Sequence, residues 1–401
     1  MSRQQTREAL LGPTLEFAAT SVPFYRRTLG RKRALTSLPF LHKEIAIRHQ
    51  RELLSSRATE PFTGIISSGT HHGSGALLQI PPRSIEEIEA LREFFAANAG
   101  PRASKPVRVL EVRAAHHGNR EAIEGRLLVS WTYSAQSLRL VEQMLSKRAA
   151  EVMVINSGAL MPLTSWFLSR GVDAKRFGIR EIGTTSFRLS PFWRALVEAT
   201  WGARLRDNFS LSELPAPALE CLKCGFHHWE PPPLYAEVID PDSKKPLTRR
   251  GETGVLVVTT LAPFVTRMPL IRYWTGDLVT IGPRCDVVGE TGFRPRGRLS
   301  QSVWKKGLRV ASLDVSDFLE GRPEVARHPH AMETLGLIPP GECGAVKYEL
   351  TARSLKVELR FDPLIFRDEA QALGRAIAKH LRLKAVELVR PGTITSKWAK
   401  F

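Results

Sequence analysis

Short aliphatic and β-branched runs recur along the first half of the chain, each with the length of a strand. They are VRVLEV, RLLVSW and EVMVIN, at residues 107–112, 126–131 and 151–156. Because helical patterns lie between and beside these runs, the sequence predicts strands and helices in alternation. Such alternation indicates an α/β protein built in layers.

One helical pattern covers residues 84–99, SIEEIEALREFFAANA. Its apolar positions share one face of a helix: Ile85, Ile88, Leu91 and Phe95. Ser84 and Glu87 have the spacing of a capping box, in which each residue's side chain bonds the other's backbone N–H. A helix is therefore expected to begin directly after Ser84.

The pattern changes twice further along the chain. Residues 235–261 contain two strand-like runs around a turn rich in Pro, Lys and Gly, which predicts an antiparallel hairpin in a β-rich subdomain. After Arg298, residues 346–361 suggest two short strands, and an amphipathic helix is expected near 368–382. We therefore predict a large N-terminal domain, 1–298, and a small C-terminal α+β lid domain, 299–401.

Composition narrows the class of protein. The chain has 401 residues, 43% of them hydrophobic, which is enough for a large core and more than one domain. It contains no apolar run long enough to span a bilayer and no signal-peptide pattern at its start, so we expect a cytoplasmic protein without membrane insertion. Four cysteines are too few for a disulfide scaffold, which leaves metal binding or simple burial.

The formal net charge of +18 favours polyanionic partners. Nucleotide phosphates, coenzyme A, an acidic carrier protein or nucleic acid would all suit it, and so would a merely solvated basic surface. The sequence contains no recognisable nucleic-acid-binding module, so a nucleic-acid partner is not expected.

Two segments carry candidate chemistry. Residues 63–75, TGIISSGTHHGSG, follow a β-prone pair and can direct backbone N–H groups and hydroxyls at phosphate oxygens, although a surface loop has the same composition. Residues 220–230, ECLKCGFHHWE, contain a Cys-x-x-Cys pair with neighbouring histidines, and Cys285 follows downstream. This is the ligand count of a closed structural zinc site, and buried cysteines are an equally good interpretation.

Four stretches together resemble the adenylate-forming, or acyl-CoA synthetase, superfamily. ISSGTHHG is similar to its phosphate loop and DNFSLSE, at residues 207–213, to its aromatic-Gly-x-Thr-Glu motif. YWTGDL is similar to its Tyr-x-Thr-Gly-Asp motif and GRLSQSVWKKGLRV, at 297–310, to its hinge motif. VPFYRRTLGRKRALTSLPFLHKE and GFHHWE further resemble the phenylacetate–CoA ligase-like branch, which is related to acyl-protein synthetases.

The resemblance implies a nucleotide site. Asp277 would hold the ATP ribose, Arg298 would assist from the hinge, Phe209 would stack on adenine and Asn208 would bond its edge. Glu213 would hold Mg²⁺ on the triphosphate. The remaining implied nucleotide-binding residues are Ser67, Ser68, Gly69, Thr70, Gly73, Gly183 and Ser212.

The resemblance also implies a catalytic lysine and a metal centre. Lys397 fits the register of the C-terminal lysine that stabilises charge during adenylate formation, and Glu213 would act with it through the metal. Some members of this branch carry a zinc ion, for which Cys221, Cys224, His227 and Cys285 would be the ligands.

The implied reaction is ATP-dependent activation of a carboxylic acid as an acyl-adenylate. Transfer to a thiol follows, either of coenzyme A or of the phosphopantetheine of an acidic carrier protein. The alternative is a degenerate member that binds nucleotide or acyl group, or serves as a scaffold, without turnover. This alternative is supported by departures from the family motifs. They are His71-His72 in the phosphate loop, Ser210 in place of glycine, and Ser300-Gln301 where the family has acidic residues.

Overall fold

The computed structural model of the chain divides into two compact units. One consists of Met1–Ser104 and Asn208–Pro295, and the other of Lys105–Asp207 and Arg296–Phe401. The residues that the structure describes are 3–29, 34–56, 65–66, 78–98, 107–114, 126–147, 150–214, 216–229, 234–305, 308–341, 343–351 and 354–395.

The second unit begins with five parallel strands in the order β4-β3-β5-β6-β7. Their bounds are β3 Val109–Ala114, β4 Arg126–Trp131, β5 Val152–Asn156, β6 Glu181–Thr185 and β7 Arg204–Phe209. The three strands expected from the aliphatic runs are therefore confirmed, with ends that move by up to two residues. The mixed α/β class is confirmed as well.

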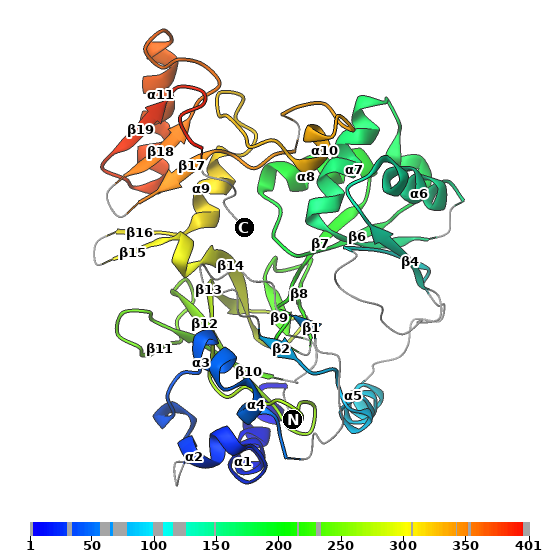
Figure 1. Cartoon of the computed structure of the whole chain (residues 1–401), viewed down its shortest axis with the longest axis vertical. Coiled ribbons are helices and arrows are strands. Elements are labelled where there is room, and N and C mark those ends of the chain that lie inside the picture. Colours follow the sequence, from blue (N-terminus) through cyan, green and yellow to red (C-terminus); the bar gives the residue numbers. More distant parts are fainter. Residues whose placement is uncertain are drawn as a thin grey trace. The chain divides into compact units, whose positions relative to one another are not determined.

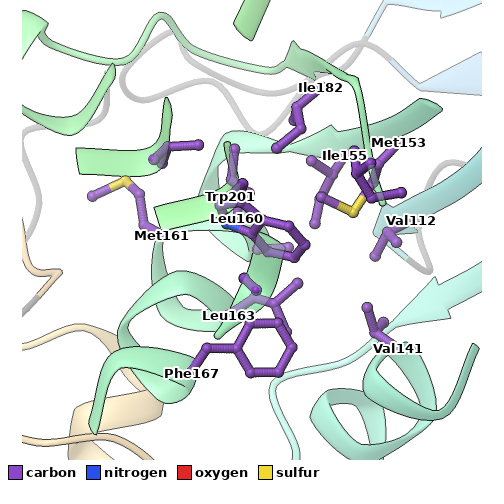
Figure 2. Packing of buried hydrophobic residues seen from close by; sticks show 14 of the residues in the cluster. Val112, Val141, Met153, Ile155, Leu160, Met161, Leu163, Phe167, Ile182 and Trp201 are labelled. Carbon is purple, nitrogen blue, oxygen red and sulfur yellow. The ribbon is translucent and has the colours of Figure 1, made fainter. Parts of the chain in front are cut away.

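Three helices gather beside this parallel sheet, coloured green in Figure 1: α6 Ala135–Ser146, α7 Ser157–Ser169 and α8 Pro191–Trp201. Polar caps fix where they begin, because Ser134 accepts from Ser137 N and Asn156 accepts from Gly158 N. Figure 2 shows strand side chains, such as Ile155, and helix side chains, such as Leu160 and Phe167, in one buried cluster. This apolar cluster holds the parallel sheet and its helices together.

The rest of the second unit is smaller α+β structure. Its elements are η4 Leu299–Gln301, β15 Val303–Lys305, β16 Leu308–Val310, α9 Ser312–Leu319, α10 Ala331–Thr334, β17 Tyr348–Leu350, β18 Leu355–Glu358, α11 Arg367–Leu381 and β19 Val386–Val389. The expected helix near 368–382 and the two strands around 352–354 are present. Met332, Ile338 and Cys343 join the core of the parallel sheet. The domain boundary at 298 stays a prediction.

The first unit combines helices with antiparallel strands in the order β11-β10-β12-β13-β14-β9-β8. The elements are α1 Arg3–Ser21, α2 Pro23–Leu29, η1 Leu35–Ser37, α3 Lys43–Arg48, α4 Gln50–Leu53, β1 Ile65–Ile66, β2 Gln79–Ile80, α5 Ile85–Asn98, β8 Ala218–Glu220, β9 His227–Trp229, β10 Leu234–Ile239, β11 Pro246–Leu247, β12 Thr253–Thr260, β13 Tyr273–Arg284 and β14 Thr291–Arg298. The predicted hairpin is confirmed, because β10 and β12 pair antiparallel.

The capping box at α5 has the expected geometry. Ser84 N donates to Glu87 Oε2 at 2.9 Å, and Glu87 N donates to Ser84 Oγ at 3.2 Å. The expected apolar face begins differently, because Ile85 is 71% exposed whereas Glu87 is buried. Glu87 is buried since its carboxylate also accepts from Arg267 N at 2.7 Å. At this end of the helix the hydrogen bond with Arg267, and not the apolar periodicity of the sequence, therefore decides which side chain is buried.

Among the described helices, none is both long enough and apolar enough to cross a membrane.

Candidate active site and metal centre

Asp277 lies on a bulge within strand β13. Val255 pairs with Leu278 and Val257 with Trp274, so three residues, Thr275 to Asp277, face the single residue Leu256. Gly276 has a φ of +79°, which a residue with a side chain rarely adopts. The strand does not end at this bulge but continues to Arg284.

The bulge holds Asp277 firmly. Thr275 Oγ1 donates to Leu256 O at 2.9 Å across the sheet and accepts from Asp277 N at 3.0 Å. Asp277 itself is only 8% exposed. These hydrogen bonds fix the backbone from which the buried Asp277 carboxylate projects, so its position is defined before a ligand binds.

Glu213 lies in the same unit, and its carboxylate is part of a buried group of three side chains. Lys43 Nζ lies 3.1 Å from Glu213 Oε1, and Tyr273 OH donates to the same oxygen at 3.2 Å. The side chains of Lys43 and Glu213 are 9% and 8% exposed. Two buried donors therefore converge on Glu213 Oε1, and a carboxylate supplies the oxygen ligands that magnesium prefers.

The main chain around Arg272 brings Lys43 and Tyr273 together. Leu41 N donates to Arg272 O at 2.9 Å and Trp274 N donates to Leu41 O at 3.0 Å, which joins the segment before Lys43 to the start of β13. The Arg272 guanidinium donates to Leu38 O at 2.8 Å and forms a buried ion pair with Glu237. Arg272 has a φ of +49°, a conformation that these contacts hold in place.

The two residues predicted to contact adenine lie at the end of β7. Asn208 pairs with Leu219 and Phe209 with Ala218. The Phe209 ring makes edge contacts with Trp229 and Phe293, at centroid distances of 6.1 and 5.5 Å. Ser212 is exposed in the turn that follows. Asn208, Phe209, Ser212, Glu213 and Asp277 thus all belong to the first unit.

The other predicted residues belong to the second unit or fall outside the described residues. Gly183 is buried in the middle of β6, and Arg298 ends β14, both in the second unit. Gly297, with a φ of +98°, passes so close to Ser312 that a side chain there would clash with Ser312 Oγ. The residues outside the described ranges are Ser67, Ser68, Gly69, Thr70, Gly73 and Lys397.

Three cysteines come together just beyond the ends of β8 and β13. The Sγ atoms of Cys221, Cys224 and Cys285 all lie within 4.8 Å of one another. Cys221 Sγ and Cys285 Sγ are 3.7 Å apart, too far for a disulfide. Two sulfur ligands on one tetrahedral zinc, each about 2.3 Å from the ion, stand about 3.8 Å apart. The thiols therefore have the spacing of a zinc site.

A histidine, His228, contacts one of these cysteines. Its Nε2 lies 3.2 Å from Cys224 Sγ. The ring of His227, the predicted ligand, instead stacks on Phe293 at a centroid distance of 5.7 Å. Both histidines are on β9, where neighbouring side chains point to opposite faces, so only one of the two can face the cysteines. The structure thus places His228, and not the predicted His227, beside Cys224.

The thiols of the cluster differ in acidity. Burial disfavours the Cys221 thiolate, but hydrogen bonds from the backbone of Cys224 and Lys223 outweigh burial, so its pKa is lowered. Burial raises the pKa of Cys224 to about 11. Cys221 thus loses its proton more readily than Cys224, and a bound cation would favour the thiolate form of both.

Sequence reasoning missed Lys43, Tyr273 and His228. Lys43 stands in a charged stretch, HKE, where a lysine is ordinarily solvated, and no spacing marks it as buried. For His228 the missing information was the position of strand β9: with it, the alternation of side chains along a strand would have shown that His227 and His228 face opposite sides.

Comparisons with known proteins agree with the motifs. No protein-family model matches the chain. A phenylacetate-coenzyme A ligase from Thermus thermophilus is 24% identical over 405 residues, which cover 94% of this chain and 88% of that protein. A 2-hydroxyisobutyryl-CoA ligase, solved with 2-HIB-AMP and CoA, matches with a TM-score of 0.65 at 16% identity, over 98% of this chain and 89% of the other.

A third similar protein is the anthranilate CoA ligase AuaEII, solved with anthranoyl-AMP. It matches with a TM-score of 0.50 at 15% identity, over 82% of this chain and 64% of the other. The chain therefore has the fold of the adenylate-forming enzymes. Its sequence resembles a phenylacetate-coenzyme A ligase, which confirms the likeness inferred from the motifs.

Proposed function

We propose that the protein activates a carboxylic acid with ATP and transfers the acyl group to a thiol. A carboxylate oxygen of the acid attacks the α-phosphorus of ATP, a new P–O bond forms, and pyrophosphate leaves with its bonding electron pair. The thiol sulfur then attacks the acyl carbon, AMP leaves, and the thiol proton passes to solvent. Coenzyme A is the acceptor that the names of the relatives favour.

The observation that carries this proposal is the pair of buried carboxylates in the first unit. Asp277 stands on a bulge formed by Thr275, Gly276 and Asp277 itself, and Glu213 accepts hydrogen bonds from Lys43 and Tyr273. In this proposal Asp277 accepts hydrogen bonds from both ribose hydroxyls of ATP. Glu213 would hold Mg²⁺, which would neutralise the triphosphate oxygens.

The acid itself belongs to the proposal. The relatives act on phenylacetate and form 2-hydroxyisobutyryl-CoA or anthranoyl-AMP, so aromatic and short hydroxy acids are both candidates. Aromatic acids come first, because the phenylacetate ligase is the relative with the higher sequence identity.

The zinc site is a separate part of the proposal. We expect Cys221, Cys224, Cys285 and His228 to hold one zinc ion that ties the turn after β8 to the end of β13. Three thiolates and one imidazole make a closed site, which supplies folding energy and leaves no position for a substrate.

ATP–pyrophosphate exchange with a panel of aryl and hydroxy acids tests the first half-reaction without any assumption about the thiol. Wild-type exchange should depend on one class of acid, and Asp277→Asn should lose it. The exposed Asp242→Asn is a control with the same chemical change, and should keep the exchange. If none of the acids in the panel supports exchange, the proposal is refuted and the non-catalytic alternative is favoured. Thioester formation with coenzyme A, and with a phosphopantetheinylated carrier protein, then identifies the acceptor.

A further inference from the structure

A pocket in the second unit is formed by α6, α7 and the turn after α10, all near the top right of Figure 1. Its volume is about 480 Å³, within the range of small-molecule sites. One face of α6 contributes residues at positions i, i+3, i+4 and i+7 of the helix. The lining residues are Ala135, Leu138, Arg139, Glu142, Trp166, Arg170, Gly336 and Leu337.

The aromatic wall of the pocket is Trp166 with a guanidinium on its face. The Cζ atom of Arg170 lies 4.3 Å from the centroid of the Trp166 ring. Arg170 is fixed there because its Nη1 also donates to Glu142 Oε2 at 2.9 Å. An indole and a planar guanidinium are both surfaces on which a nucleobase stacks.

The charge of the pocket is positive. Its single carboxylate, Glu142, already pairs with Arg170 and lies 3.9 Å from Arg176. Arg139, one turn away on α6, has no carboxylate partner within the described part of the chain. A guanidinium presents a planar fork of donors that fits phosphate oxygens, so Arg139 is a phosphate-binding group without a competitor in the pocket.

We propose that this pocket binds the phosphorylated adenosine group of a nucleotide, with the base against Trp166 and Arg170 and a phosphate on Arg139. Two molecules can supply that chemistry: coenzyme A through its 3′-phospho-ADP end, or a free adenine nucleotide. Coenzyme A would make the pocket the anchor of the thiol substrate. The assignment of the ligand to coenzyme A rests on the proposed function, whereas the binding of a phosphorylated adenosine group does not.

The probe for this proposal is adenosine 3′,5′-bisphosphate, which lacks the pantetheine arm. Equilibrium dialysis of the labelled probe should show one saturable site on the wild-type protein. Arg139→Ala should lower the affinity for the probe by about 10- to 100-fold, the usual effect of losing one charge-assisted hydrogen bond. Trp166→Leu should weaken it in the same direction by removing the stacking surface. The control is Arg250→Ala, which removes an exposed arginine of the first unit and should bind like wild type.

Competition distinguishes the two sources. Displacement of the probe by coenzyme A, with ATP ineffective on an Asp277→Ala background, identifies coenzyme A. In that case Arg139→Ala should raise the KM for coenzyme A while pyrophosphate exchange keeps its wild-type rate. Equal displacement by ATP identifies a free nucleotide.

The dialysis needs no turnover, so a protein that fails to activate any acid still gives a result. A wild-type protein that does not bind the probe, or variants at Arg139 and Trp166 that bind it like Arg250→Ala, would overturn the proposal.

Discussion

The two adjacent histidines of β9 provide the sharpest test of the metal centre. His228→Gln removes the nitrogen that lies 3.2 Å from Cys224 Sγ, whereas His227→Gln changes a ring that stacks on Phe293. Both substitutions remove an imidazole from the same buried strand, so each is the control for the other. We expect only His228→Gln to lower zinc affinity.

The magnitude follows from the ligand count. Structural zinc sites bind with an apparent free energy of about 10–16 kcal/mol. One ligand of four then contributes about 2.5–4 kcal/mol on an equal division, which corresponds to a loss of about 10²- to 10³-fold in zinc affinity. The three cysteines should still hold zinc weakly, so His228→Gln should lose the metal to a chelator that leaves the wild-type protein loaded.

The assay is zinc content by elemental analysis after dialysis against a graded series of a chromophoric chelator. About one zinc per chain is expected for wild type and for His227→Gln, with an earlier loss for His228→Gln. The result that would refute the reasoning is the reverse order, because it would mean that β9 presents its other face to the cysteines. Wild-type protein that purifies without zinc, with no chelator present, would retire the metal centre altogether.

Three further outcomes are expected. Asp277→Ala should weaken the binding of ATP by about 1.5–3 kcal/mol for each lost hydrogen bond to the ribose, and an unchanged affinity in calorimetry would contradict the ribose assignment. Lys397→Ala should slow pyrophosphate exchange by about 10²- to 10³-fold while a preformed acyl-adenylate is still transferred to the thiol, and exchange at the normal rate would remove Lys397 from the first step. Burial raises the pKa of Glu320 from 4.5 to about 6 despite the neighbouring Arg327, so its protonated form favours folding. That contribution, about 2 kcal/mol, is complete below pH ~4.5 and is lost as the pH rises through ~6; thermal unfolding of Glu320→Gln should lack this slope, and equal slopes would show that another group titrates.

Local signals in the sequence predicted several elements correctly. The aliphatic runs marked β3, β4 and β5, because a strand between helices needs apolar residues wherever it is covered. The capping box marked the start of α5, because it uses only residues three positions apart. The order of the motifs also indicated a likeness to the adenylate-forming enzymes, and the comparisons confirm that likeness in sequence and in fold.

Other features depend on contacts between distant parts of the chain. The bulge at Asp277 exists only because β12 lies opposite β13 with Leu256 facing three residues. Lys43 reaches Glu213, 170 positions away, because a backbone bridge joins Leu41 to Tyr273. The periodicity or spacing of residues within one segment cannot predict these contacts between distant segments.

The sequence by itself determined which side chains are available: a carboxylate after Thr-Gly, a Cys-x-x-Cys pair with two histidines, and a basic chain. The tertiary structure decided which of them meet. His228 rather than His227 faces the cysteines because strand alternation assigns opposite faces to neighbours, and the face toward Cys285 is set by the pairing of β9 with β8 and β14. Arg139, Trp166 and Arg170 form one pocket only because α6 and α7 pack beside the same parallel sheet.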